Sequence, residues 1–549
     1  MKRVVSGIAC AVLLVLLPGC AQIGSVVGNL MTQKTSNLGD VAMQVRLIQN
    51  LYPKEAATTE VSYASDKWVP GSNSLVVNFT KRQGIGMYTI DGVIKNGADT
   101  LPYWSNGVYA RTVSDLGPQP VEVVTSSGQT FKTTVTPVEP IKIKSVNGGT
   151  GTIDFNKDLV LEFEHPKGAK NTEGKAYLIL DVMGTTSFVE IASFRLKDKV
   201  TIPAVAFRNI PNLKPRTGPT WLLVERFKVE PVQRGVVGAC QVISVAWDHA
   251  QVTVTGELDK VDFINTKIES GEDDKKLVAE LSKPNAYTGK PFSTAKKMAL
   301  VSLSVRATKL MQTRTSTNTT KTYGGGYVTT TTTTTTSTRK FPTLPDAYWD
   351  KLLDNLYKDV SGLMKKRYNI ELIPMEKVLA SKTYQDLEEI KDEASVVEVS
   401  KSYKGTKSLI PTSLSSMISS VSSTFAADRT DARLIEELDV DGLISVTLDL
   451  EMPWFDEAAK ATLAPRLAIR ISGEPNGYLY GPTIYTQGVV YGMGDPISDA
   501  IMESGSFPGE FLEGVVRLKD LNTLLNKALD EQAAREKELG YQEIWNLRK

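Results

Sequence analysis

The side chains that most often perform catalysis or bind metals are few in this chain of 549 residues. Its two histidines, His165 and His249, stand far apart, and neither belongs to an HExxH-type run, so they cannot form a three-histidine metal site. No GxSxG nucleophile elbow occurs. Gly174-Lys175 lacks the following Ser or Thr and the upstream spacing of a phosphate loop. The sequence therefore predicts no catalytic residue, no metal, no cofactor and no enzyme.

One acidic turn, Asp439-Val440-Asp441-Gly442, is similar to the start of a calcium loop. Leu443 occupies the next ligand position, where a calcium loop needs an oxygen donor. We therefore expect a turn between a helix and a strand at this point.

The clearest chemical motif lies at the amino terminus. Met1-Lys2-Arg3 is basic, residues 9–17 are mostly apolar, and Leu17-Pro18-Gly19-Cys20 follows. This order is typical of a bacterial secretory signal peptide, and its cleavage motif resembles a lipobox with Cys20 as the acylated first residue. Two or more acyl chains of the palmitate type would give stable membrane anchoring. The apolar run is too short to favour a transmembrane anchor, and a cysteine directly after Gly19 favours a lipoprotein over an ordinary signal peptide.

The residue after the cysteine bears on location. Ala21 rather than Asp follows Cys20, which resembles the pattern for sorting to the outer membrane. The expected location is therefore the outer membrane, with the protein anchored by lipid and mostly facing the periplasm. Exposure at the cell surface is the alternative.

The net charge and the cysteine content indicate which partners and which disulfides to expect. The chain has 63 Lys and Arg and 62 Asp and Glu, so the mature protein is nearly neutral and we expect no nucleic-acid partner. Of three cysteines, Cys10 leaves with the signal peptide and Cys20 is lipidated, which leaves Cys240 alone. No intramolecular disulfide is expected, and Cys240 should be a small buried hydrophobic residue.

The mature chain of about 530 residues is long enough for three or four domains. Its first half, up to residue 256, alternates short strands with turns such as Asn96-Gly97, which predicts β-sandwich modules of immunoglobulin-like type. Alternation from Val41 to Leu47 already indicates a first strand. The predicted divisions are a signal peptide (1–19), a tether (20–50), β-sandwich module 1 (51–140), β-sandwich module 2 (141–256), a linker (257–297), an α/β domain (298–517) with a Thr-rich insertion (313–340), and a carboxy-terminal helix (518–549).

Residues 298–450 alternate strands and helices, which predicts an α/β layer architecture. A strand at 298–305 precedes a helix that Pro345 and Asp346 begin. That helix repeats apolar residues at spacings of three and four: Trp349, Leu352, Leu353, Leu356, Val360, Leu363 and Met364. A strand at 370–373, a helical segment at 375–392, a helix at 432–438 and a strand at 441–448 are expected to follow.

This order of elements resembles the CsgG family of curli-secretion lipoproteins and the TolB amino-terminal domain. The resemblance rests on "IELIPMEKVL", "LIEELDVDGLISVTLDLE" and "LAIRISGEPNGYLYGPTIYTQGVVYG", and covers roughly the second half of the chain. It implies a fold more than a function, because no catalytic motif defines such domains. In the curli family, hairpins from this domain enter the outer membrane as a multi-subunit channel.

The Thr-rich insertion is the counterpart of such a hairpin. Two Thr-rich stretches flank a triple glycine, so either an exposed hairpin or a disordered low-complexity loop is expected. Its two faces would both be largely Thr, with Arg314, Lys321 and Arg339 added, which disfavours a lipid-facing strand. Residues 395–425 carry Leu414 and Met417 at helical spacing and predict a core-facing or partner-facing helix.

The carboxy-terminal helix has an apolar face that starts at Leu521 and a strongly charged end. That end is expected to be a solvated tail or an oligomer contact made by Tyr541, Ile544 and Trp545.

Lipid anchoring, several modules and the lack of catalytic sets predict a non-enzymatic adaptor. It would act by protein–protein contacts, with envelope proteins or with itself, in envelope assembly or secretion. A CsgG-like oligomeric export channel component is one alternative. A lipoprotein that binds cell-wall glycan is the other, motivated by the aromatic residues Trp68, Tyr103 and Trp104.

Overall fold

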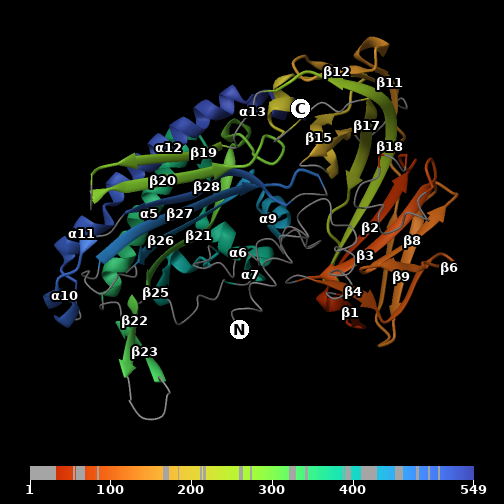
Figure 1. Ribbon diagram of the computed structural model, residues 1–549. Coiled ribbons are helices and arrows are strands. Elements are labelled where there is room, and N and C mark those ends of the chain that lie inside the picture. Colours follow the sequence, from red (N-terminus) through yellow and green to blue (C-terminus); the bar gives the residue numbers. More distant parts are fainter. Residues whose placement is uncertain are drawn as a thin grey trace.

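Figure 1 shows a computed structural model of the chain. The structure describes residues 32–53, 56, 69–82, 86–164, 172–182, 185–210, 213, 218–258, 264–272, 275–308, 310–320, 329–339, 344–387, 389, 397–409, 430–451, 462–477, 481–492, 495–504 and 507–549. Within these residues the protein is mostly β-sheet, with several sheets and a smaller helical part toward the carboxyl terminus. This agrees with the coarse prediction of a multidomain chain in which β modules come first.

The largest sheet has eleven strands, in the order β1-β4-β3-β2-β18-β17-β14-β15, with β7, β8 and β12 attached beside this path. Val41, Met43, Val45 and Leu47 of β2 are fully buried, as their alternation predicts. β2 pairs in parallel with β18, so one sheet takes strands from both segments predicted as β-sandwich modules and from the predicted tether. The strands are β1 (Thr32–Thr35), β2 (Val41–Gln49), β3 (Asn73–Lys81), β4 (Met87–Ile90), β7 (Tyr103–Ser105), β8 (Val108–Val113), β12 (Thr152–Asp154), β14 (Glu173–Val182), β15 (Thr185–Arg195), β17 (Pro219–Val229) and β18 (Ala239–Thr255).

Two small sheets share apolar cores with this large sheet. Val121 and Phe131 of the first cluster with Val45 and Phe79 of the large sheet, and Leu161 of the second clusters with the apolar residues of β14. We call residues 32–258 the N-terminal unit. The small sheets consist of β5 (Gly92–Asn96), β6 (Asp99–Thr100), β9 (Gln119–Thr125) and β10 (Thr130–Val135), and of β11 (Lys142–Val146), β13 (Leu159–Glu164) and β16 (Lys199–Ile202).

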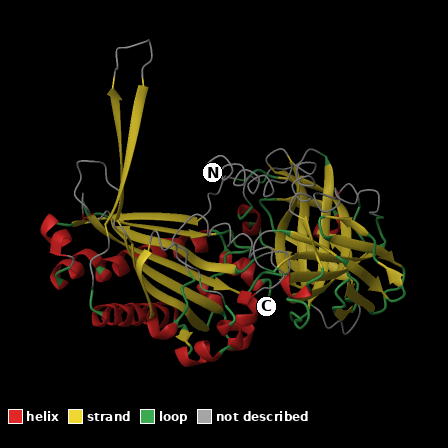
Figure 2. Cartoon of the chain, turned by 90° about the horizontal axis from the view of Figure 1, so that it is seen from below, coloured by secondary structure: helices red, strands yellow, loops and turns green. Residues whose placement is uncertain are grey.

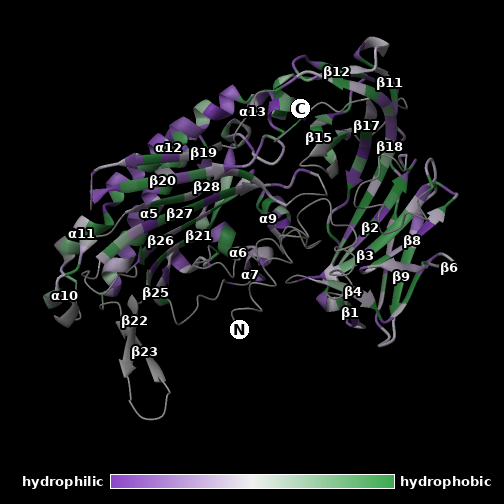
Figure 3. Cartoon of the chain, viewed as in Figure 1, coloured by the Kyte–Doolittle hydropathy of each residue, from purple (hydrophilic) through white to green (hydrophobic). Residues whose placement is uncertain are grey.

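A nine-stranded sheet organises residues 264–549, which we call the C-terminal unit. Its order is β19-β20-β28-β27-β26-β21-β24, with β25 on β21 and β29 on β27. The pair β21 and β26 is parallel, and both strands are lined by buried aliphatic residues, which Figure 3 shows in the hydrophobic colour. The strands are β19 (Ile264–Ser270), β20 (Leu277–Lys283), β21 (Lys297–Thr308), β24 (Glu371–Leu372), β25 (Val397–Ser402), β26 (Gly442–Glu451), β27 (Thr462–Gly473), β28 (Thr483–Gly492) and β29 (Asp495–Pro496).

Helices α5 and α12 lie on the same face of this sheet, because both pack over Val446, Leu467 and Ile469. As predicted, α5 begins at Asp346 after Pro345 and buries its apolar stripe from Trp349 to Met364. The helices of the described residues are α4 (Val205–Arg208), α5 (Asp346–Tyr368), α6 (Met375–Ala380), α7 (Lys382–Gln385), α9 (Thr430–Leu438), α10 (Asp499–Ser504), α11 (Gly509–Val516), α12 (Leu518–Glu538) and α13 (Tyr541–Asn546), with short 3-10 turns at Leu38–Asp40, Asn147–Gly149, Phe292–Thr294 and Tyr403–Gly405.

Two predicted segments differ from the structure. The helical segment predicted at 375–392 is broken into α6 and α7 because Ser381 is extended and its hydroxyl caps the start of α7. In the segment predicted as a helix at 395–425, residues 397–402 form strand β25, paired with β21. Leu414 and Met417 lie outside the described residues.

The Thr-rich insertion forms a hairpin. Strand β22 (Leu310–Thr320) pairs with β23 (Thr329–Arg339) in an antiparallel register that sets Thr315 opposite Thr334. Figure 2 shows both strands projecting away from the body of the protein. Of the two alternatives for this insertion, the structure has the hairpin.

The carboxy-terminal residues differ from their prediction. After Gly540, whose φ of 63° ends α12, helix α13 turns into the protein. Tyr541, Ile544 and Trp545 are buried there against apolar residues of the N-terminal unit and of the chain before β21. They are therefore core residues of the chain itself, and neither a solvated tail nor an exposed oligomer contact.

Candidate functional site

The predicted site residues are placed as follows. Six of them lie outside the described residues: Leu17, Pro18, Gly19, Cys20, Trp68 and His165. The others, discussed below, are not brought together into one site.

Cys240 and His249 both lie on β18, nine positions apart, which separates them by about 30 Å along the strand. Cys240 is fully buried, and this burial raises the pKa of its thiol to about 12. The prediction of a small buried hydrophobic residue is confirmed, because such a thiol stays neutral and unreactive. His249 packs edge-on against Trp221 at 5.4 Å between ring centres. These two residues therefore cannot act as a nucleophile and its base.

The aromatic residues proposed for glycan binding lie on β7. Tyr103 is 41% exposed, and its ring packs edge-on against Tyr109 at 5.1 Å between ring centres. Trp104 is half-buried and packs against a different apolar cluster from the one that contains Tyr109, the partner of Tyr103. They do not form a shared aromatic platform.

The turn at Asp439–Gly442 connects α9 to β26, as predicted. Asp439 has a φ of 51° and its carboxylate pairs with Lys297 at 2.9 Å. The Asp441 carboxylate accepts hydrogen bonds from the backbone amides of Lys296 and Lys297 at 2.6 and 2.9 Å. These carboxylates hold the amino-terminal ends of strands β21 and β26 together.

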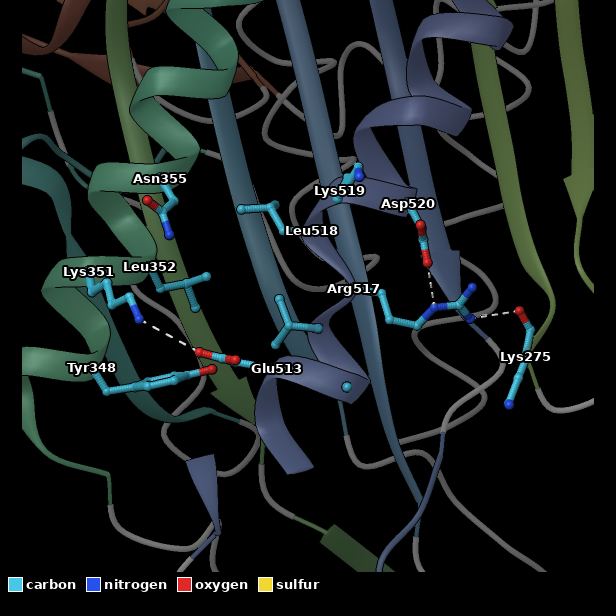
Figure 4. Close-up of a pocket in the computed structure, with 12 residues that line it drawn as sticks. Lys275, Tyr348, Lys351, Leu352, Asn355, Glu513, Arg517, Leu518, Lys519 and Asp520 are labelled. Atoms are coloured by element: carbon cyan, nitrogen blue, oxygen red, sulfur yellow. Dashed lines mark hydrogen bonds and ion pairs between the residues drawn. The ribbon is translucent and has the colours of Figure 1, made fainter. Parts of the chain in front are cut away.

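A first candidate site is a cavity of about 660 Å³ between α5, α11 and α12, which we call the helical groove (Figure 4). Lys351 of α5 lies 3.6 Å from the Glu513 carboxylate of α11. Arg517, between α11 and α12, pairs with Asp520 at 3.0 Å and donates to the carbonyl of Lys275 at 2.7 Å. The pair of Lys351 and Glu513 is exposed, so it can exchange partners at little cost.

A second candidate site lies where residues of the C-terminal unit pack into an apolar core of the N-terminal unit. We call this contact the seam. The Tyr287 hydroxyl, from the loop after β20, donates to the carbonyl of Ala206 at 2.7 Å. Asn209 donates to the carbonyl of Leu539 at 2.8 Å and accepts from the amide of Ala286 at 3.1 Å. These buried bonds fix the two units relative to each other, because breaking one leaves a buried polar group unpaired.

An ion pair lies at the centre of the seam. Lys175 of β14 donates to the Glu190 carboxylate of β15 at 2.9 Å, and both side chains are almost fully buried. Lys175 also donates to the carbonyl of Asn476 at 3.1 Å, and the Asn476 amide donates to the carbonyl of Tyr287 at 2.7 Å. Burial raises the pKa of Glu190, but Lys175 and the hydroxyl of Ser193 outweigh it, so this pKa lies below its usual value. Glu190 is therefore ionised at neutral pH.

Beside this ion pair lies a cavity of about 1040 Å³, which we call the seam cavity. The N-terminal unit contributes Glu173 and Phe227, and the C-terminal unit contributes Lys290, Glu474 and Arg548. Both signs of charge line it, and the seam provides rigid walls. The arrangement can bind and orient a charged molecule.

No sequence pattern predicts the seam. Lys175 sits in a strand pattern like any polar strand residue, and its partners Glu190 and Asn476 follow 15 and 301 residues later. Gly174-Lys175, which lacks the features of a phosphate loop, lies in β14. The one available signal was a charged residue at an alternation position otherwise filled by Tyr177 and Ile179.

Within the part of the chain that the structure describes, no group of three or more His, Cys, Asp or Glu side chains could hold a metal ion. Among those same residues, no helix combines the length and apolar character needed to cross a membrane. No protein-family model matches the chain, and no curated protein is significantly similar to it.

Proposed function

We propose that this protein is a lipid-anchored component of the bacterial cell envelope, held at the outer membrane through Cys20. It acts without catalysis, by protein–protein contacts in envelope assembly or secretion. The leader sequence up to Cys20 supports the anchor. The observation that carries the contact function is the projecting hairpin of β22 and β23 (Figure 2).

The hairpin has two open edges. Among the described residues, β22 and β23 pair only with each other, over eleven residues each. A two-stranded ribbon is marginally stable in water, and each outer edge presents unpaired amide and carbonyl groups that another strand can complete. A protein that extends such a ribbon from its body presents a surface suited to contact with another protein.

The finer fold assignment belongs to the same proposal. The first β module is of immunoglobulin-like type, and residues 298–517 form a domain similar to the CsgG family. The parallel pairing of β21 with β26 and the packing of α5 beside them support this likeness. Strand β22 begins two residues after β21 ends, so the nine-stranded sheet forms the base of the hairpin.

Site-specific photocrosslinking in intact cells tests the contact function. A photoreactive amino acid at Thr334 of β23 should give discrete adducts with another envelope protein. The same amino acid at Lys358, an exposed position on α5, is the matched control and should not give these adducts. Failure of Thr334 to give any adduct beyond those of Lys358 would remove the basis of the proposal.

The hairpin also favours a second candidate, an oligomeric export channel component. Edges that are open on both sides can pair with hairpins of further copies of the chain. Adducts at Thr334 that contain only this protein, together with ring-shaped particles in electron microscopy, would favour this candidate over the adaptor. Monomeric particles would exclude it.

A further inference from the structure

The seam cavity has the size and lining of a ligand site. At about 1040 Å³ it lies just above the usual range for small-molecule pockets, and both units contribute to its wall. The buried bonds of Lys175, Asn209 and Tyr287 hold that wall in place. A preformed cavity of this kind binds without a large ordering cost.

Two cations form one side of the cavity. Lys290 lies over the Trp545 ring, with its ammonium 5.7 Å from the ring centre, and the Arg548 guanidinium stacks on the same ring at 3.5 Å. The Lys290 ammonium has no hydrogen-bond acceptor among the described residues. Arg548 donates to the carbonyl of Tyr287 at 3.3 Å, while its buried Nε atom has no partner. The Lys290 ammonium is thus a donor for an acceptor group of a ligand, and Arg548 adds positive charge beside it.

Two carboxylates form the adjacent side. Glu173 comes from the start of β14 and Glu474 from the turn between β27 and β28, so the two units contribute one each. Neither carboxylate has a hydrogen bond or an ion pair within the described residues. Burial and the nearby Glu474 carboxylate raise the pKa of Glu173, and the cations Lys175, Arg548 and Arg195 offset only part of this rise. A cation placed between them would relieve this repulsion.

The two sides are close together. Burial lowers the pKa of Lys290, and Glu474 acts against this by favouring the charged ammonium. A polyanion bound at Lys290 and Arg548 would be repelled by the two carboxylates. A polyamine bound at the carboxylates would be repelled by the two cations. Only a ligand with both charges satisfies both sides.

We propose that the seam cavity binds a short zwitterionic peptide, with its carboxylate at Lys290 and Arg548 and its ammonium between Glu173 and Glu474. This site is separate from the hairpin and from the protein contacts proposed for it. A free amino acid shares the same chemistry, so the test compares the two sources.

Calorimetric titration of the full-length, detergent-solubilised protein tests the site. The probes are trialanine, N-acetyl-trialanine, trialanine amide and alanine. Trialanine should bind saturably, and blocking either terminus should weaken binding about tenfold or more, because each removes a hydrogen-bonded charge. Alanine that binds as tightly as trialanine would identify a free amino acid as the ligand. Absence of saturable trialanine binding, or equal binding of all three peptides, overturns the proposal.

Two variants assign the ends of the ligand. Lys290→Gln should weaken trialanine but leave trialanine amide unchanged, and Glu474→Gln should remove the difference between trialanine and its N-acetyl form. Lys351→Gln in the helical groove is the matched control and should bind like the wild type. Unchanged trialanine binding in both variants contradicts the proposal. If either variant fails to fold, the blocked peptides still decide the question on the wild-type protein.

Discussion

The seam and the helical groove both gather charged side chains, yet they differ in what surrounds those charges. In the seam, Lys175 and Glu190 are 1% and 3% exposed, and carbonyl and hydroxyl groups complete their hydrogen bonds. In the groove, Lys351 and Glu513 are each 71% exposed and lie 3.6 Å apart. The same two charge types are thus structural in one region and replaceable in the other.

The difference follows from solvation. A buried charge loses several kcal/mol of hydration, which only a partner at short distance can offset, so the pair must be kept whole. An exposed pair keeps its water and gains about 0–1 kcal/mol from the contact. The seam therefore depends on exact partners, while the groove tolerates substitution and can exchange its partners.

The largest expected effect comes from breaking the seam ion pair. Glu190→Ala leaves the Lys175 ammonium buried without its carboxylate, and should lower the free energy of unfolding by about 3–5 kcal/mol. Urea denaturation followed by circular dichroism measures this change. The double variant Lys175→Met with Glu190→Leu should recover much of the loss. A loss no larger than that of Glu513→Ala would erase the distinction between the two regions.

A smaller effect is expected from the amide that links the units. Asn476→Ala removes the donor to the Tyr287 carbonyl, a buried bond of 2.7 Å, and should cost about 1–3 kcal/mol in the same assay. Asn355→Ala in the helical groove is the matched control, and a change within about 0.5 kcal/mol is expected there. Equal costs at both positions would show that Asn476 does not hold the seam.

The seam ion pair should also make the free energy of unfolding depend on pH. Because the pKa of Glu190 is lower in the folded protein than its ordinary value of 4.5, the unfolded chain binds the proton first. Its contribution to stability is complete above pH 4.5 and is lost as the pH falls through the folded-state pKa. Unfolding free energies measured between neutral and acidic pH should fall less steeply for Glu190→Gln than for the wild type. Parallel curves would contradict this assignment.

The smallest effect is expected in the groove itself. Lys351→Ala should change the free energy of unfolding by less than about 1 kcal/mol, and added salt should reduce the difference further, because the pair with Glu513 is exposed. A loss comparable to that of Glu190→Ala would mean that the groove is a structural site.

Local patterns predicted the elements, while contacts between distant residues could not be predicted. The spacing from Trp349 to Met364 fixes the buried face of α5, and alternation from Val41 to Leu47 fixes β2, because each signal lies within a few consecutive residues. The break at Ser381 depends on its own backbone and cap. Tyr541 and Trp545 have a mixed, charged neighbourhood in sequence. Only contacts with distant residues reveal them as core: Tyr541 packs with apolar residues of the N-terminal unit, and Trp545 donates to the carbonyl of Gly289.

The seam shows the same limit for the candidate site. Lys175, Glu190 and Asn476 carry no motif. Lys175 and Glu190 meet on the neighbouring strands β14 and β15, and Asn476 reaches Lys175 from the other unit, 301 residues later in the chain. The lipidation motif at Cys20 is the opposite case. It is readable from four consecutive residues, and it lies outside the described part of the chain.

Fractionation of cells that carry Cys20→Ser tests the central claim most directly, because anchoring by lipid at the envelope precedes every contact proposed here. The account predicts that wild-type protein sediments with the outer membrane, while the variant, having no thiol to acylate, leaves that fraction. A variant that stays in the outer-membrane fraction in the same proportion as the wild type would contradict the claim.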